Sequence, residues 1–132
     1  MLFLSENLPM LEVVIESPLK GRRYPDEGVV LALLDTGYEG FLLVPPDLFE
    51  TLFEGIEPER RTLLLADGRL TESIGTYGLV SLPDLGREVE GFVETAKGVD
   101  EIVAGLELAS EFRIILDYCT GTAVADPCPK PA

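Results

Sequence analysis

An uninterrupted apolar run, from Val29 to Leu34, ends directly at Asp35 and restricts the fold more than any other feature of the sequence. Six consecutive apolar residues fit a β-strand that is covered on both faces. A carboxylate at the end of such a strand needs a reason to be there, because burying an unpaired carboxylate costs free energy. The run therefore predicts a buried strand that leads into a residue with a functional role.

Short apolar runs separated by turn residues continue along the rest of the chain. They predict further strands at 11–16, 41–44, 62–66, 70–82, 87–94, 112–117 and 122–125. Asp67 and Gly68 stand between two of these runs, and Asp-Gly in that position is a strong signal for a β-hairpin. One short helix is predicted from Pro46 and a second at 106–111. The fold class is therefore predicted to be mostly β, with one or two short helices.

The length of 132 residues fits one domain, and a hydrophobic fraction of 46% allows it a buried core. The predicted division is an N-terminal segment at 1–10, a folded domain at 11–125 and an extended, proline-rich tail at 126–132. No positively charged segment precedes the apolar N-terminal residues, and no apolar run approaches the roughly 20 residues of a membrane span. We therefore expect a cytoplasmic protein.

Charge and composition exclude several classes of function. The 24 acidic and 10 basic residues leave a formal net charge of −14, whereas nucleic acids and anionic membranes require clustered Lys and Arg. We expect neither as a partner. The sequence has no histidine, which removes Ser-His and Cys-His catalytic sites. Two cysteines are too few for a cysteine zinc site, and the acidic residues lack the spacing of a calcium loop, so no metal or other cofactor is expected.

Three further features follow Asp35-Thr36-Gly37 in a definite order. The predicted hairpin places glycine at its turn, in the segment Ala66-Asp67-Gly68. A second apolar element that ends in glycine, Val103-Ala104-Gly105, lies near the C-terminus, and a short helix and a strand follow it. In this order and spacing the chain resembles the retropepsin-like (retroviral-type, clan AA) family of single-domain aspartic proteases over about residues 11 to 125. Within that family it looks like a group of small cellular, prokaryotic-type members.

The resemblance implies a closed β-barrel that acts as a homodimer, because one Asp-Thr-Gly supplies only one of two carboxylates that share a proton. It implies an aspartic endopeptidase that hydrolyses a peptide or an unfolded protein. Asp35 of each protomer would activate a water, Thr36 would brace the pair by hydrogen bonding, and Gly37 would let the backbone approach. The substrate-binding residues that it implies are Tyr38, Ala66, Asp67, Gly68, Val103 and Gly105.

Each of these residues also has a simpler interpretation. The Asp-Thr-Gly triplet is also consistent with a strand end and a turn, Asp67-Gly68 with a plain hairpin turn, and Gly105 with a packing glycine. Tyr38 stands where retroviral enzymes usually have Ala or Ser, and it is either a substrate contact or a packed aromatic. Two alternatives to a peptidase remain for the whole chain: a non-catalytic homodimeric peptide-binding module of the same fold, or an unrelated β-barrel interaction domain. Cys119 and Cys128 are either two free thiols or a disulfide.

Overall fold

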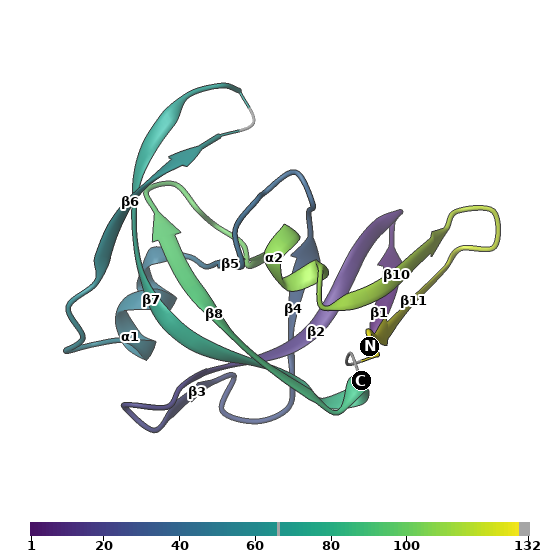
Figure 1. Ribbon diagram of the computed structural model, residues 1–132, viewed down its shortest axis with the longest axis horizontal. Helices are drawn as coiled ribbons and strands as arrows, with labels where there is room; N and C mark the ends of the chain where they lie inside the picture. The colour runs from purple at the N-terminus through teal and green to yellow at the C-terminus, as the bar shows by residue number, and fades with distance from the viewer. Residues whose placement is uncertain (66, 130–132) are drawn as a thin grey trace.

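In its described residues, the protein is built from β-strands, two short α-helices and one 3-10 turn (Figure 1). The computed structural model describes residues 1–65 and 67–129. The helices are α1 (Pro46–Leu52) and α2 (Leu106–Ala109), and the 3-10 turn is η1 (Pro83–Leu85). The strands are β1 (Leu2–Ser5), β2 (Leu8–Ser17), β3 (Arg22–Tyr24), β4 (Val30–Leu34), β5 (Leu42–Leu43), β6 (Glu59–Leu64), β7 (Leu70–Leu82), β8 (Arg87–Ala96), β9 (Val103–Ala104), β10 (Phe112–Asp117) and β11 (Thr122–Pro127).

Strand pairing closes six of these strands into a barrel. β2 pairs with β4, β4 with β9, β9 with β5, β5 with β8 and β8 with β7. The ring closes where β7 returns to β2, with Ile15 opposite Val80. The pairs β4–β9 and β5–β8 are parallel, and the other pairs of the ring are antiparallel. A closed ring leaves none of its strands with a free edge. The predicted fold class, a mostly β closed barrel with one or two short helices, is therefore confirmed.

The strand before Asp35 differs from its prediction in one respect. Ala32 and Leu34 point into the barrel core and are buried, but Leu31, just before Ala32, is 43% exposed. The expected cover on both faces is therefore wrong for this strand. The reason is that successive side chains of a barrel strand point to opposite faces, and only the inner face is packed against the core.

The strands extend into both segments that flank the predicted domain of residues 11–125. β1 pairs with β2 so that Leu2 lies opposite Leu11, and both side chains are buried. β11 pairs with β10 in a separate two-stranded sheet and continues to Pro127. Of the predicted tail, residues 130–132 lie outside the described part of the chain. The two cysteines are free thiols, with Cys119 exposed in the turn after β10 and Cys128 half-buried after β11.

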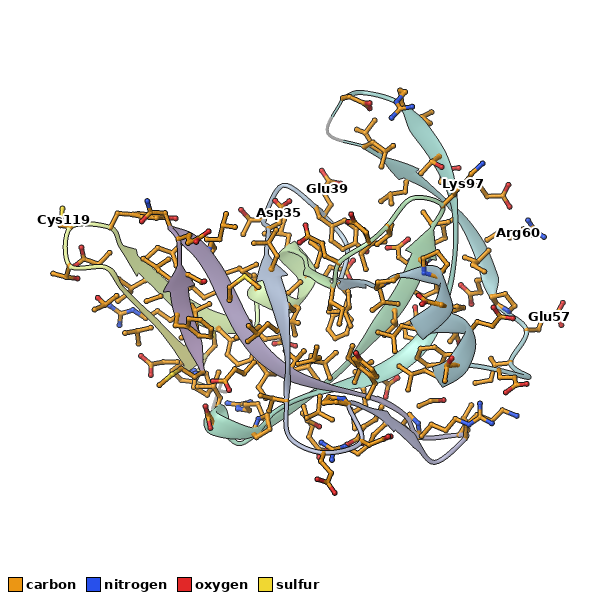
Figure 2. All side chains as sticks on the ribbon, turned by 180° about the vertical axis from the view of Figure 1, so that it is seen from behind. Asp35, Glu39, Glu57, Arg60, Lys97 and Cys119 are labelled. Atoms are coloured by element: carbon orange, nitrogen blue, oxygen red, sulfur yellow. The ribbon has the colours of Figure 1, made fainter. Side chains whose placement is uncertain are left out.

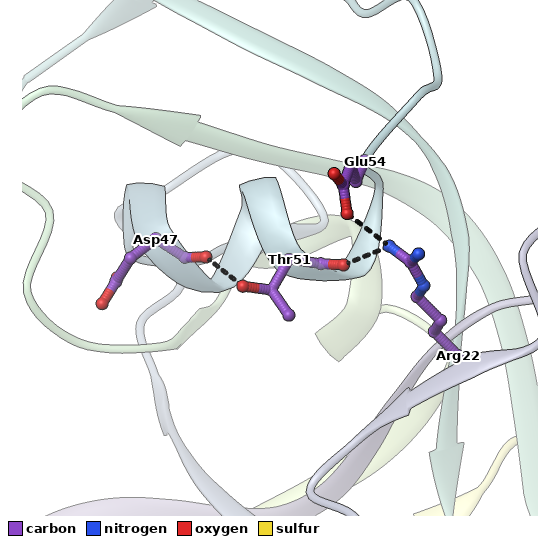
Figure 3. Close-up of polar contacts among 4 residues, drawn as sticks. All are labelled: Arg22, Asp47, Thr51 and Glu54. Carbon is purple, nitrogen blue, oxygen red and sulfur yellow. Dashed lines mark hydrogen bonds and ion pairs between the residues drawn. The ribbon is translucent and has the colours of Figure 1, made fainter.

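Helix α1 is joined to the neighbouring strand β3 by polar contacts at its C-terminal end (Figure 3). The guanidinium of Arg22 donates to the carbonyl oxygen of Thr51 at 2.8 Å and contacts the carboxylate of Glu54 at 3.4 Å. A cation there satisfies a terminal carbonyl and complements the helix dipole. Phe49 and Leu52 bury the opposite side of the helix in the core. Of the helices in the described ranges, none has the length and apolar character that crossing a membrane requires.

Candidate active site

Asp35 is the first residue of the loop that leaves β4, and its side chain lies at one end of the barrel (Figure 2). The parallel strand β9 holds the backbone on both sides of the strand end. The N–H of Leu33 donates to the carbonyl of Ile102 at 2.8 Å, and the N–H of Asp35 donates to the carbonyl of Ala104 at 2.9 Å. Asp35, Thr36 and Gly37 are all exposed. The carboxylate is therefore held by the strand ladder yet open to solvent, so in one protomer it carries no cost of burial.

The turn after Asp35 orients this carboxylate. The N–H of Gly37 donates to Oδ1 of Asp35 at 2.9 Å, and the N–H of Tyr38 donates to the Asp35 carbonyl at 3.2 Å. A side-chain oxygen that accepts from a backbone N–H two residues later forms an Asx turn. A Cβ added at Gly37 would lie 3.0 Å from the same oxygen, so the turn has little room for a larger residue.

Loop 38–40 packs against the first turn of α2. The N–H of Leu106 donates to the carbonyl of Tyr38 at 2.8 Å, and the N–H of Glu107 donates to the carbonyl of Gly40 at 3.1 Å. Gly105 lies beneath this contact, where an added Cβ would lie 2.7 Å from the Tyr38 carbonyl oxygen. Gly105 is therefore required by the close approach of two backbones, and that contact connects α2 to the loop that begins at Asp35.

Substitution of Gly105 by Ala is expected to lower the free energy of unfolding by about 3 kcal/mol, because overpacking forces the two backbones apart. Urea denaturation followed by circular dichroism measures the loss. Gly121→Ala is the control, since that glycine has a positive φ of 72° and no atom within 4 Å of an added Cβ. It should lose only about 1 kcal/mol, the cost of the backbone conformation. Equal losses in the two variants would contradict the role assigned to Gly105.

Tyr38 connects the loop to the barrel wall through a buried carboxylate. Its hydroxyl donates to Glu94 of β8, and the Ser73 hydroxyl of β7 donates to the other carboxylate oxygen at 2.8 Å. Glu94 is only 6% exposed. Burial, followed by the bond to Glu94, raises the pKa of the Tyr38 phenol well above its ordinary value. The phenol therefore stays protonated and remains a hydrogen-bond donor at every pH at which the protein would work.

A cavity of about 300 Å³ lies beside this loop. It is lined by residues 37–40 of this loop and by Thr62, Leu63 and Leu64 of β6. Glu94 of β8 also belongs to its lining. A larger cavity of about 490 Å³ lies between α1 and residues 100–102, and no residue of loop 35–40 lines it. Of these two cavities, the smaller one, which is lined from Gly37 to Gly40, is therefore the nearer to the Asp35 turn.

The β6–β7 hairpin projects from the barrel (Figure 1), and its tip is a self-contained turn. The N–H of Gly68 donates to the carbonyl of Leu65 at 2.9 Å, and Gly68 has a φ of 86° that favours glycine. The Asp67 carboxylate accepts from the backbone N–H and from the guanidinium of Arg69. Ala66, predicted here as a substrate contact, lies outside the described residues. Asp67 and Gly68 do not line the cavity, whereas β6 does.

The predicted site residues thus fall into separate groups. Gly105 and residues 35–38 lie together, because backbone hydrogen bonds connect the loop after Asp35 to the first turn of α2. Val103 is buried in β9, opposite Leu33 of β4 and Leu43 of β5. Within the described ranges, no group of three or more Asp, Glu or Cys residues is arranged to hold a metal ion.

Glu94 is absent from the residues predicted from the sequence, although a signal for it exists there. It is a lone carboxylate in the otherwise uncharged run from Gly91 to Ala96. The argument that singles out Asp35 applies equally to Glu94. A carboxylate in an apolar strand is costly to bury unless it has a partner or a function.

Comparison with known proteins places the chain in a family and in a fold. No family model matches the sequence. A protein of Archaeoglobus fulgidus, described as uncharacterized, is 44% identical to it over 121 residues, which cover 91% of this chain and 94% of that protein. The crystal structure of a retropepsin-like aspartic protease from Rickettsia conorii matches with a TM-score of 0.62 at 14% identity, over 94% of this chain and 97% of that one. The chain therefore belongs to one family with the A. fulgidus protein, and its fold is that of a retropepsin-like aspartic protease.

Proposed function

We propose that this protein is an aspartic endopeptidase that acts as a homodimer. Two Asp35 carboxylates, one from each protomer, share one proton because both cannot ionise at close range. The charged carboxylate takes a proton from a water, and the protonated carboxylate donates to the carbonyl oxygen of the peptide. The observation that carries the proposal is the exposed, strand-anchored Asp35 turn, in a fold similar to that of a retropepsin-like aspartic protease.

The need for a second copy follows from the number of carboxylates. The chain contains a single Asp-Thr-Gly, and its Asp35 is exposed rather than paired inside one protomer. A two-fold axis that passes near Asp35 would bring two such carboxylates together and bury them. Thr36, which is exposed beside Asp35, would then hydrogen-bond across the axis. The titration would belong to the pair and not to either residue.

The hairpin formed by β10 and β11 supports an interface between two copies. Ile115 and Val124 lie directly opposite each other on its outer face and are 47% and 46% exposed. Exposed apolar residues that pair across two strands favour burial against another protein surface. In Figure 2, Asp35 lies between this hairpin, whose turn carries Cys119, and the projecting β6–β7 hairpin. A partner that packed on the β10–β11 hairpin would therefore come near the Asp35 loop.

The proposal predicts cleavage of unstructured peptides that is faster in mild acid than at neutral pH. The rate should fall as the pH rises through the upper pKa of the carboxylate pair, about 4.7 in a comparable dyad, because the proton that is donated is then lost. Cleavage of a peptide panel between about pH 4 and pH 7 measures this. A hydroxyl-bearing transition-state mimic such as pepstatin should block it.

Two outcomes would contradict the endopeptidase proposal. Cleavage that the mimic leaves unchanged would mean that another group performs the hydrolysis. A dimer that binds peptides from the panel and cleaves none of them would favour the peptide-binding module of the same fold.

A further inference from the structure

The cavity beside Asp35 combines an apolar wall with a buried carboxylate. Leu63 and Leu64 of β6 belong to its lining, and so does Glu94 of β8. Gly37 and Tyr38, which lie two and three residues after Asp35 in the chain, also line it. A cavity of about 300 Å³ is at the lower end of the range for small-molecule sites, so it suits one side chain of a longer ligand.

The charge of Glu94 has no cationic counterpart in the described part of the protein. Its carboxylate accepts from two neutral hydroxyls, those of Tyr38 and Ser73. No Lys or Arg nitrogen among the described residues lies within ion-pair distance of it. A carboxylate that is 6% exposed is ordinarily paired with a cation, because burial of an uncompensated charge is costly.

Other charged residues around the cavity leave this imbalance in place. Arg61 also lines the cavity, but its guanidinium stacks 3.5 Å from the ring centre of Phe92 and contacts the carboxylate of Glu59 at 3.5 Å. Glu39 and Glu107 add two exposed carboxylates to the lining. Burial and Glu94 are the main causes that raise the pKa of the Tyr38 phenol; among the smaller ones, Glu107 raises it and Arg61 lowers it, so these two charges act on the phenol in opposite directions.

We infer that, in the endopeptidase proposed above, this cavity is a specificity pocket that binds a lysine or arginine side chain of the peptide near the scissile bond. The aliphatic stem of such a side chain packs along Leu63 and Leu64, and its charged end pairs with Glu94. Its arrival supplies the missing cation for a carboxylate that is already desolvated and oriented, so little further ordering is required. An apolar side chain of the same length would leave Glu94 uncompensated.

Binding of matched peptides to the Asp35→Asn protein tests the inference without interference from cleavage. Each pair of peptides carries lysine or norleucine at the same position, and the position is moved along the peptide. Fluorescence anisotropy at about pH 6, where ordinary carboxylates are ionised, measures the affinities. At one position lysine should bind about tenfold more tightly than norleucine. Glu94→Gln in the same background should reduce this preference to about twofold.

Two further variants separate a loss of charge from a loss of fold. Glu90→Gln removes the same charge from an exposed position on the same strand and should keep the tenfold preference. Glu107→Gln removes an exposed carboxylate from the cavity lining itself. The preference for lysine over norleucine should then fall from about tenfold to about threefold. Norleucine peptides that bind as well as lysine peptides at every position would overturn the inference. It would also be overturned if Glu94→Gln kept the full preference, whatever the result for Glu107→Gln.

The wild-type protein distinguishes a failure of this inference from a failure of the proposed function. Cleavage of norleucine and lysine peptides at equal rates would overturn the pocket assignment and leave the endopeptidase proposal standing. A lysine preference in binding, without cleavage of any peptide, would support the pocket and count against the endopeptidase.

Discussion

Substitution of Asp35 by Asn is expected to abolish peptide cleavage while leaving the protein folded and dimeric. An amide cannot share a proton with the second carboxylate, so both the base and the acid of the reaction are lost. The rate should fall by at least about 10³-fold. The fold should survive because the amide oxygen of Asn can accept the hydrogen bond from the Gly37 N–H that Oδ1 accepts at 2.9 Å. Peptide cleavage, circular dichroism and light scattering measure the three properties.

Asp26→Asn is a matched control, because it makes the same change in an exposed loop remote from Asp35. It should cleave as fast as the unsubstituted protein. Addition of excess Asp35→Asn protein to the unsubstituted protein should also lower the activity beyond simple dilution, since mixed dimers hold one carboxylate. Full activity in Asp35→Asn, or no effect of mixing, would contradict a site shared between protomers.

Substitution of Val124 by Lys is expected to separate the dimer and remove activity with it. Val124 faces outward on β11 beside Ile115, so the change leaves the core of the protomer intact. In a symmetric interface the substitution buries two unpaired ammonium groups, which costs several kcal/mol. At micromolar concentration the dimer should dissociate, and cleavage should fall by about 10²-fold or more. Analytical ultracentrifugation and the peptide assay measure the two effects.

Val29→Lys provides the comparison, because Val29 is an exposed valine just before β4 and lies outside the β10–β11 hairpin. That variant should remain dimeric and active. A dimer that persists in Val124→Lys with full activity would place the interface elsewhere. A wild-type protein that is monomeric at high concentration and still active would contradict the shared carboxylate pair itself.

Elements with strong local signals are predicted correctly from the sequence. The hairpin around Asp67-Gly68 and the helix that starts at Pro46 both appear in the structure. Turn chemistry and an apolar stripe act over only a few neighbouring residues, so their effect is visible in a short window of sequence. The closed barrel is predicted in a different way, from the resemblance of the order of motifs to a known family.

The Tyr38–Glu94–Ser73 connection shows why side-chain networks are not predicted in the same way. Tyr38 and Glu94 are 56 positions apart in the sequence, and Ser73 and Glu94 are 21 apart. Taken alone, Tyr38 fits a packed aromatic and Ser73 an ordinary strand serine, and the isolated carboxylate of Glu94 does not identify its partners. Their meeting depends on the pairing of β7 with β8, which places Ser73 opposite Ala96 and Gly75 opposite Glu94.

Local patterns in the sequence are enough to place the strand that leads to Asp35, the hairpin turn and the two short helices, and to make Asp35-Thr36-Gly37 a candidate site. Three features depend on the folded barrel: Asp35 is exposed in one protomer, β6 and not the described hairpin-tip residues lines the cavity, and Glu94 belongs to that lining. These features follow from register, because the pairing of distant strands around a closed barrel determines which side chains point inward, and a shift of one residue reverses them.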